Sequence, residues 1–330
     1  MQAFEYARPT TAEAAVALLG SQWGDSEVLA GGTDLVSLMK DYVVSPKRLV
    51  SLKDIKSLGG IEYKPKSGLR LGATVTFQEL LDSPEIARNY PALVQAAQGV
   101  TSPQIRSRGT VGGDLCQRPR CWYFRLGYGL LAQSDGKPLV PDGDNRYHAI
   151  LGNEGPAYFV NPSSLAPILI ALGAKVRVQG QQGVREVSLH NFFITPKSAE
   201  EREYALQPNE MLTDILVPPP EGIHMALYEV RQKEALDWPL AAAAVAFKLS
   251  GGKVDDPRVV LGHVAPVPWP SLEAEHALEG NTVGEASADE AGKAAVSRAT
   301  PLSKNAYKVK LAHVAVKRAI LAAAKGGANA

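Results

Sequence analysis

Hydrophobic and polar positions along the first fifty residues predict one compact unit. The pattern indicates a helix over residues 11–19, a short strand over 27–30, a second helix from Leu35 and a second strand over 49–52. The apolar side chains of the second helix recur at helical spacing and form one stripe: Leu35, Val36, Leu38, Met39, Tyr42 and Val43. Two strands joined by such a helix predict a βαβ unit.

Shorter elements follow between residues 68 and 189. The pattern predicts a strand over 68–73, helices over 77–81, 91–98 and 165–172, and a hairpin of two strands over 175–179 and 184–189. Residues 116–155 show no clear period and mix aromatic residues with Gly, Asp and Asn. A stretch of this length without period is expected to form a long functional loop.

Three successive prolines, Pro218–Pro220, mark the clearest break in the chain, because they continue neither a helix nor a central strand. We therefore expect a first domain over residues 1–220, with subdomains of about 1–60 and 61–220, and a C-terminal domain over 221–330. In the C-terminal domain the pattern predicts an antiparallel sheet with strands over 225–231, 241–248 and 258–264, followed by two helices.

Composition limits the class of function. The 330 residues are 45% hydrophobic and 21% charged, as in ordinary globular proteins. Lys and Arg (35) balance Asp and Glu (34), so no net field favours nucleic acid. Leu240–Phe247, the longest apolar stretch, is far too short to cross a bilayer, so no membrane insertion is expected. Two cysteines form no disulfide framework, which favours a reducing, cytoplasmic location.

The first candidate site is the segment Val28–Leu35, where a strand leads into a helix. Its adjacent Gly31 and Gly32 allow the backbone to approach a ligand and to point successive amides at an anion. Thr33 or Asp34 is expected to cap the helix, with Asp34 turned onto its own helix or onto a sugar hydroxyl. The loop lacks the Lys of a Walker motif and the third Gly of a Rossmann fingerprint.

A second glycine loop lies about eighty residues downstream, in Gln104–Leu115. It contains three glycines, a threonine and an aspartate, as the sequence Arg108-Gly-Thr-Val-Gly-Gly-Asp-Leu115 shows. Two such loops on different sheets are able to grip one diphosphate from both sides. A dinucleotide is therefore the natural ligand.

Together the two loops, followed by Asn161–Pro167, resemble the FAD-binding medium subunit of the molybdenum hydroxylases, the family of xanthine dehydrogenase and carbon monoxide dehydrogenase. The resemblance covers essentially the whole chain. It implies an α+β fold: a two-subdomain FAD-binding domain of the PCMH type, followed by a smaller C-terminal domain with an antiparallel sheet and helices. It also implies a large molybdopterin-binding subunit and a small [2Fe–2S] subunit as partners, with NAD or another compound as electron acceptor.

Carried over position by position, the family pattern implies that the first loop binds the FAD pyrophosphate and that the second contacts the pyrophosphate and the flavin side. The implied cofactor-binding residues are Leu29, Ala30, Gly31, Gly32, Thr33, Asp34, Leu35, Val100, Thr101, Gly109, Thr110, Gly113, Asp114, Gln117, Ser164 and Leu212. Two positions depart from the family: Ser164 stands where many relatives have Asp, and Glu229 where they have Lys. No catalytic residue is expected in this chain.

Cys116 and Cys121 follow directly on the second loop. This stretch resembles the medium subunits of bacterial aldehyde oxidoreductases, some of which carry a [4Fe–4S] cluster in the loop that follows. Such a cluster takes four thiolates, and no cysteine follows Cys121, so we expect no metal site here.

Two other functions stay open at this stage. A self-sufficient FAD-dependent oxidoreductase predicts turnover by the chain alone, with a substrate pocket and its own base. A flavin-free assembly or interaction subunit is suggested by Ser164, by Glu229 and by the missing cluster ligands.

Overall fold

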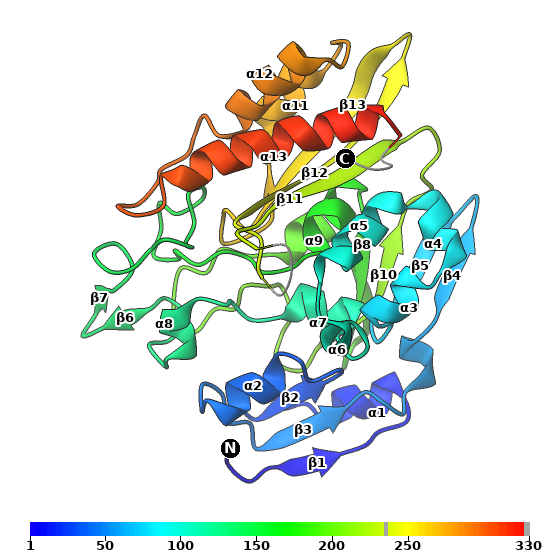
Figure 1. Ribbon diagram of the computed structural model, residues 1–330. Coiled ribbons are helices and arrows are strands. Elements are labelled where there is room, and N and C mark those ends of the chain that lie inside the picture. The colour runs from blue at the N-terminus through cyan, green and yellow to red at the C-terminus, as the bar shows by residue number, and fades with distance from the viewer. Residues whose placement is uncertain (234–236, 327–330) are drawn as a thin grey trace.

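The computed structural model describes residues 1–233 and 237–326 (Figure 1). Its N-terminal unit is a parallel sheet in the order β1–β3–β2, from β1 (Glu5–Ala7), β2 (Ser26–Leu29) and β3 (Arg48–Ser51). The helix α2 (Leu35–Lys40) joins β2 to the parallel β3, which confirms the predicted βαβ unit. The helix α1 (Ala12–Ala17) packs its buried Ala15 and Val16 into the small core of this unit.

The second subdomain is built on a five-stranded antiparallel sheet in the order β4–β5–β10–β8–β9. Its strands are β4 (Ile61–Lys64), β5 (Gly68–Gly72), β8 (Lys175–Gly180), β9 (Gly183–Ser188) and β10 (Met211–Val217). Short helices accompany it: η1 (Lys56–Leu58), α3 (Phe77–Leu81), α4 (Pro84–Asn89), α5 (Pro91–Gly99), α6 (Pro103–Arg106), α7 (Val111–Cys116), α9 (Ala166–Ala171) and α10 (Leu189–Phe192).

The central strand β10 escaped the sequence analysis. Its buried Thr213 and Asp214 interrupt the apolar pattern that marks a central strand. The Asp214 carboxylate is stabilised there by Arg70 of the neighbouring β5, whose guanidinium nitrogen lies 2.6 Å from a carboxylate oxygen. A buried charge is tolerated when it is paired, so a strand can contain one without a visible signal in the pattern.

The C-terminal unit is a four-stranded antiparallel sheet in the order β11–β12–β13–β14, as predicted for its three long strands. They are β11 (His224–Val230), β12 (Ala241–Ser250) and β13 (Lys253–Gly262), with the two-residue β14 (Trp269–Pro270) at the edge. The small buried alanines of β12 let helices approach both faces of this sheet. One face carries α13 (Tyr307–Ala324), and the other meets α5 and α9 (Figure 1).

The expectation of two C-terminal helices is wrong, because three helices follow the sheet within the described residues. They are α11 (Leu272–Leu278), α12 (Glu285–Ala295) and α13. The short α11 begins at a local cap, since the Ser271 hydroxyl accepts a hydrogen bond from the Ala274 amide at 3.2 Å. Caps of this kind let a helix of two turns form without a long apolar stripe.

Residues 116–155 form the long loop that the sequence predicted, and the labels β6 and β7 mark its position in Figure 1. It contains α8 (Trp122–Arg125), β6 (Gln133–Ser134) and β7 (Lys137–Pro138). The buried Lys308 of α13 holds this loop to the C-terminal sheet: its ammonium group donates to the carbonyl oxygens of Tyr147, His148 and His263 at 3.3, 3.0 and 2.8 Å. Within the described ranges no helix is long and apolar enough to span a membrane.

Candidate functional site

The first glycine loop connects β2 to α2 and begins the site. Gly32 adopts a left-handed conformation with φ of +75°, which glycine tolerates without strain. Within the part of the chain that the structure describes, the amides of Gly31, Gly32 and Thr33 donate to no acceptor. Three successive unpartnered donors at a strand-to-helix turn form the anion cradle that the sequence predicted.

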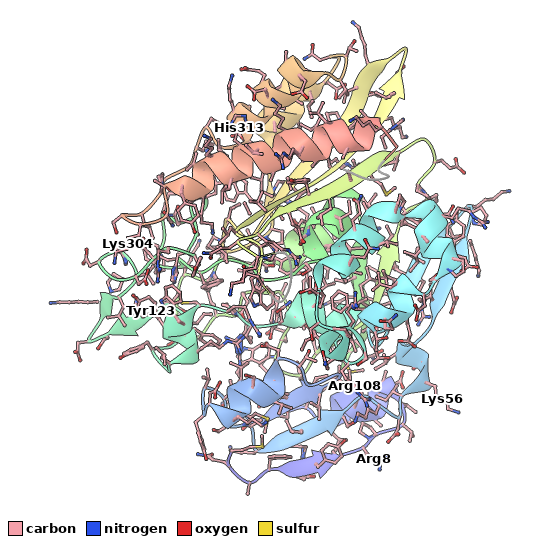
Figure 2. All side chains as sticks on the ribbon, viewed as in Figure 1. Arg8, Lys56, Arg108, Tyr123, Lys304 and His313 are labelled. Atoms are coloured by element: carbon pink, nitrogen blue, oxygen red, sulfur yellow. The ribbon has the colours of Figure 1, made fainter. Side chains whose placement is uncertain are left out.

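The two glycine loops touch each other at Gly31. A Cβ placed on Gly31 would lie 1.8 Å from the carbonyl oxygen of Arg108 and 3.3 Å from the amide nitrogen of Gly109. Figure 2 shows Arg108 where the N-terminal unit meets the second subdomain. Only glycine permits this approach, so Gly31 is required by the meeting of the two loops as well as by any ligand.

The second loop contributes differently from the expectation of a matching amide cradle. Thr110 caps α7, and its hydroxyl accepts the Gly113 amide at 3.1 Å, while the Gly112 amide donates to the Ala73 carbonyl at 2.9 Å. The helix begins directly after Thr110, so its first turn uses these amides internally. The second loop therefore offers the Thr110 hydroxyl and the bare surface of the exposed Gly113.

Two joined clefts contain all sixteen predicted cofactor residues. The first cleft has about 1110 Å³ of empty space, including space open to solvent, and the second about 950 Å³. The first is lined by Leu29–Leu35 and Leu212, and the second by Val100, Thr101, Gly109, Asp114 and Ser164. Both are lined by Thr33, Asp34, Thr110, Gly113 and Gln117, which mark their junction. Whether each of these residues contacts the cofactor stays a prediction.

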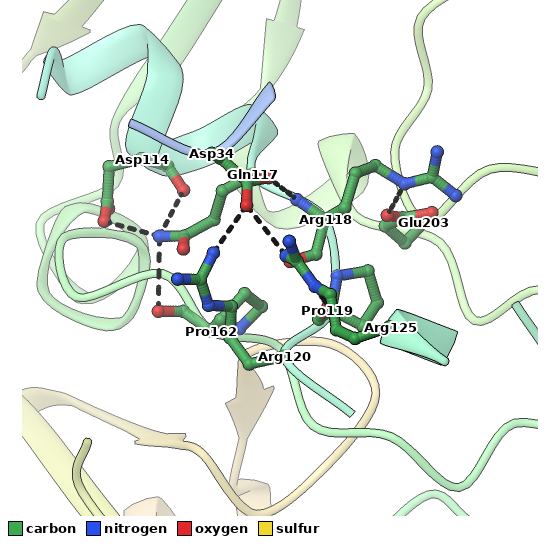
Figure 3. A network of polar contacts seen from close by, with 9 residues as sticks. All are labelled: Asp34, Asp114, Gln117, Arg118, Pro119, Arg120, Arg125, Pro162 and Glu203. Carbon is green, nitrogen blue, oxygen red and sulfur yellow. Dashed lines mark hydrogen bonds and ion pairs between the residues drawn. The ribbon is translucent and has the colours of Figure 1, made fainter. Parts of the chain in front are cut away.

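Asp34 does not turn back onto α2, which corrects one of the expectations for this residue. It occupies the N-cap position without a side-chain cap bond, and it faces the long loop instead (Figure 3). One carboxylate oxygen accepts from Arg120 and Arg125 at 2.5 and 2.7 Å, and the other accepts the Arg118 amide at 2.8 Å. The guanidinium groups compete successfully for Asp34 because charge-assisted hydrogen bonds are the stronger ones.

Asp114 is buried and organises the Asn161–Pro167 segment. It accepts hydrogen bonds from the Ser163 hydroxyl at 2.5 Å and from the Ser164 and Leu165 amides at 3.2 and 3.0 Å. It also accepts from the Gln117 amide group at 3.0 Å (Figure 3). Burial raises the pKa of Asp114, and these four donors act against that rise. Asp114 thus fixes the wall of the second cleft and the start of α9.

A second group of charges lies at the first cleft, which Glu27 and Arg118 line. Arg118 forms a close, buried ion pair with Glu203, and Arg202 lies 3.6 Å from Glu27. Burial raises the pKa of Glu27 to about 7; the Arg118 charge opposes this rise and the Glu203 charge adds to it. The ionisation state of the first cleft therefore changes near neutral pH.

The two positions that depart from the family lie at the second cleft. Ser164 is buried at its wall, and Glu229 packs behind Gly99, where a Cβ would lie 2.6 Å from the Glu229 carboxylate. Glu229 forms a close ion pair with Arg231, and its other carboxylate oxygen is buried without a partner in the described part of the chain. Burial raises the pKa of Glu229.

Sequence reasoning gave no role to the arginines of the long loop. Arg118, Arg120 and Arg125 converge on Asp34, and the Arg120 guanidinium also lies over the Trp238 ring, 4.8 Å from its centroid. Their alternation with aromatic residues is visible in the sequence, but only the fold brings them to Asp34. Cys116 and Cys121 are free thiols, and burial raises the pKa of Cys116 to about 12, so it packs as an inert thiol.

These residues fit a dinucleotide. The cradle of unpartnered amides suits a diphosphate, and the clefts on either side suit two ring systems. Unpartnered backbone amides at a strand-to-helix turn favour an anionic group.

Comparison with known families agrees with this geometry. Residues 2–220 match the FAD binding domain in molybdopterin dehydrogenase, and residues 226–323 match the CO dehydrogenase flavoprotein C-terminal domain.

Individual relatives are similar over most of their length. The chain is 31% identical to the aldehyde oxidoreductase FAD-binding subunit PaoB of Escherichia coli (strain K12), over 82% of this chain and 84% of that one. It is 30% identical to the carbon monoxide dehydrogenase medium chain of Hydrogenophaga pseudoflava, over 97% of this chain and 96% of that one. A solved structure of carbon monoxide dehydrogenase from that organism, lacking the Mo-pyranopterin moiety, superposes with a TM-score of 0.77 at 28% identity, covering 99% of both chains.

The contact between the loops predicts that Gly31→Ala loses the cofactor. The added methyl group collides with the Arg108 carbonyl and forces the loops apart. We expect FAD affinity to fall by about tenfold or more, measured by titrating flavin-stripped protein with FAD. Gly155→Ala is the matched control, since a Cβ there meets nothing within 4 Å. Equal affinity in both variants would contradict the role given to the contact.

The environment of Glu27 predicts a pH-dependent stability. The pKa of Glu27 is about 7 in the folded chain and 4.5 in the unfolded chain. The stability that protonated Glu27 contributes to the fold is therefore full below pH 4.5 and is lost as the pH rises through 7. From pH 5 to pH 8 the free energy of unfolding of Glu27→Gln should therefore rise by about 2 kcal/mol relative to the unmodified chain. Urea unfolding at constant salt measures this. Glu290→Gln, at an exposed position on α12, should show no such change, and a flat difference for Glu27→Gln would refute the assignment.

Proposed function

Because this chain belongs to the FAD-binding subunits of the molybdenum hydroxylase family, we propose that it is the electron-transfer subunit of a molybdenum-containing hydroxylase or dehydrogenase. In this proposal it receives electrons from a small [2Fe–2S] subunit and passes them to NAD or another acceptor. A large molybdopterin subunit carries out the oxidation of the substrate. The relatives named medium chain or medium subunit support such a complex of several subunits.

The observation that carries the proposal is the junction of the two clefts. FAD consists of two ring systems joined by a diphosphate. The cradle of Gly31, Gly32 and Thr33 lines the first cleft and reaches the second at Thr33. We place the diphosphate on this cradle, the adenosine half in the first cleft and the flavin ring in the second. This arrangement agrees with all sixteen residues that the family resemblance implies.

The charges of the chain act on binding and orientation. Asp34 holds Arg120 and Arg125 beside the cradle, while Glu203 holds Arg118. Asp114 keeps the wall of the second cleft in place. Bound FAD supplies the electron chemistry, and the protein supplies its position and electrostatics.

The proposal includes the division of the chain into residues 1–220 and 221–330. The limits of the two family matches and the break at Pro218–Pro220 support it. It also includes a cytoplasmic location, which the free thiols of Cys116 and Cys121 support, since such thiols are typical of a reducing compartment.

The two alternatives receive less support. A flavin-free scaffold does not account for an FAD-binding domain with an unpartnered amide cradle. A self-sufficient oxidoreductase needs a substrate pocket with its own base beside the flavin. Asp114 is taken up by hydrogen bonds, and Glu229, which is paired with Arg231 through one carboxylate oxygen, is not among the described residues that line the second cleft.

Purification of the tagged chain from its own cells tests the proposal. We expect FAD, molybdenum and iron to be recovered together, measured by flavin extraction and elemental analysis, with two further subunits identified by mass spectrometry. The Gly31→Ala variant should recover the metals with less FAD, because the added methyl group disturbs the contact between the two glycine loops. Recovery of FAD without molybdenum, together with substrate turnover by the chain alone, would favour the self-sufficient oxidoreductase.

A further inference from the structure

The first cleft contains two polar side chains for which the diphosphate cradle gives no role. They are Glu27 and Tyr204, and both lie among the residues that line this cleft. Glu27 belongs to β2, an edge strand of the N-terminal sheet, whereas Tyr204 lies between α10 and β10 in the second subdomain. The two residues therefore come from the two units that together line the cleft.

The Glu27 carboxyl group has open hydrogen-bonding positions. Its side chain is 20% exposed, and the Arg202 guanidinium with which it pairs lies 3.6 Å away, beyond hydrogen-bond distance. That guanidinium lies over the Trp23 ring, 4.3 Å from its centroid. Asp34 and Glu210, the other carboxylates among the described residues that line this cleft, are each hydrogen-bonded to arginines. Glu27 is thus the carboxyl group of this cleft that is left for a ligand.

The Tyr204 ring is fixed by aromatic neighbours, while its hydroxyl group lacks a partner. The ring stacks on Phe192, with 6.1 Å between the centroids, and meets the Trp23 ring edge-on at 6.3 Å. Tyr204 is 7% exposed, and its hydroxyl makes no hydrogen bond within the described residues. Burial raises the pKa of Tyr204 well above its usual value, so the hydroxyl keeps its proton and serves as a donor. A buried hydroxyl without a partner costs stability unless a ligand satisfies it.

Many of the other residues that line the first cleft are apolar. They come from both units and include Leu29, Leu38, Leu52, Met211 and Leu212. Apolar walls suit the flat faces of a heteroaromatic base, and a few polar groups then decide which base fits. In this cleft those groups are an acceptor and a donor.

The edge of adenine matches this pair of groups. Its amino group is a donor, and the neighbouring ring nitrogen is an acceptor. The Glu27 carboxyl group accepts from the amino group whether or not it is protonated, because a protonated carboxyl keeps acceptor capacity. The Tyr204 hydroxyl donates to the ring nitrogen. A base with an oxygen in place of the amino group, as in guanine, leaves Glu27 without a donor.

We propose that Glu27 and Tyr204 bind the hydrogen-bonding edge of adenine and make the first cleft selective for an adenine dinucleotide. This inference rests on the proposed function, because it concerns the adenosine half of the FAD that we place in this cleft. The isoalloxazine ring presents one N–H group between two carbonyl oxygens, so it matches Glu27 less well than adenine does. The two residues therefore also decide which half of FAD enters which cleft.

Titration of the full chain, purified with its partners and stripped of flavin, tests the inference. The ligands are FAD and flavin hypoxanthine dinucleotide, in which an oxygen replaces the amino group of adenine. We expect the unmodified chain to bind FAD about tenfold more tightly than the analogue. Glu27→Leu removes the acceptor and should abolish this preference, whereas Glu27→Gln keeps a carbonyl oxygen and should retain it.

Two further variants separate the hydrogen bonds from general effects on the fold. Tyr204→Phe removes only the hydroxyl group and leaves the stacked ring in place, so FAD affinity should fall by about tenfold. Glu290→Leu, at an exposed position on α12, is the matched control and should bind both ligands as the unmodified chain does.

Competition by ADP and IDP supplies a second readout that does not involve the flavin ring. ADP should displace FAD from the unmodified chain at about tenfold lower concentration than IDP, and Glu27→Leu should respond equally to both. Equal affinity of the unmodified chain for FAD and the analogue, or a preference that survives in Glu27→Leu, would overturn the inference. Unchanged FAD affinity in Tyr204→Phe would do the same. Failure of the proposed function is distinct, since it shows as a purified protein without FAD or without molybdenum.

Discussion

The close approach of the two glycine loops at Gly31 is the constraint on which the site depends. With no Cβ in the way, the Arg108 carbonyl of the second subdomain comes against the backbone of the N-terminal βαβ unit. The unpartnered amides of the first loop line the first cleft, beside its junction with the second at Thr33. If this contact were wider, the units would still fold around their own cores, but the cradle would lose its second wall.

Charges from the long loop hold this junction together. Asp34 of the first loop collects two guanidinium groups and one amide, all from residues 118–125. Asp114 of the second loop binds the segment that starts α9, and Gln117 links it to the Pro162 carbonyl at 3.4 Å (Figure 3). Asp114 is buried, and Asp34, Arg120 and Arg125 are partly buried, so each would be costly without its partners. The network thus specifies one arrangement of three segments that are far apart in the sequence.

Much of the fold was predictable from the sequence, because it depends on local patterns. The βαβ unit, the hairpin β8–β9 and the long strands of the C-terminal sheet follow from apolar periodicity. β10 was missed because the Arg70–Asp214 pair compensates a charge inside a central strand, and α11 because a single cap starts it. Pairings across long sequence distances leave no local signal.

The same distinction applies to the site. The glycine loops carry their own sequence signature, so the candidate residues on the two clefts were recognisable before the structure. The turn of Asp34 toward the arginines was not, because it depends on where residues 118–125 lie after folding. The hydrogen bonds that amides of the second loop make within the fold were not recognisable either, because they depend on the residue at which α7 begins.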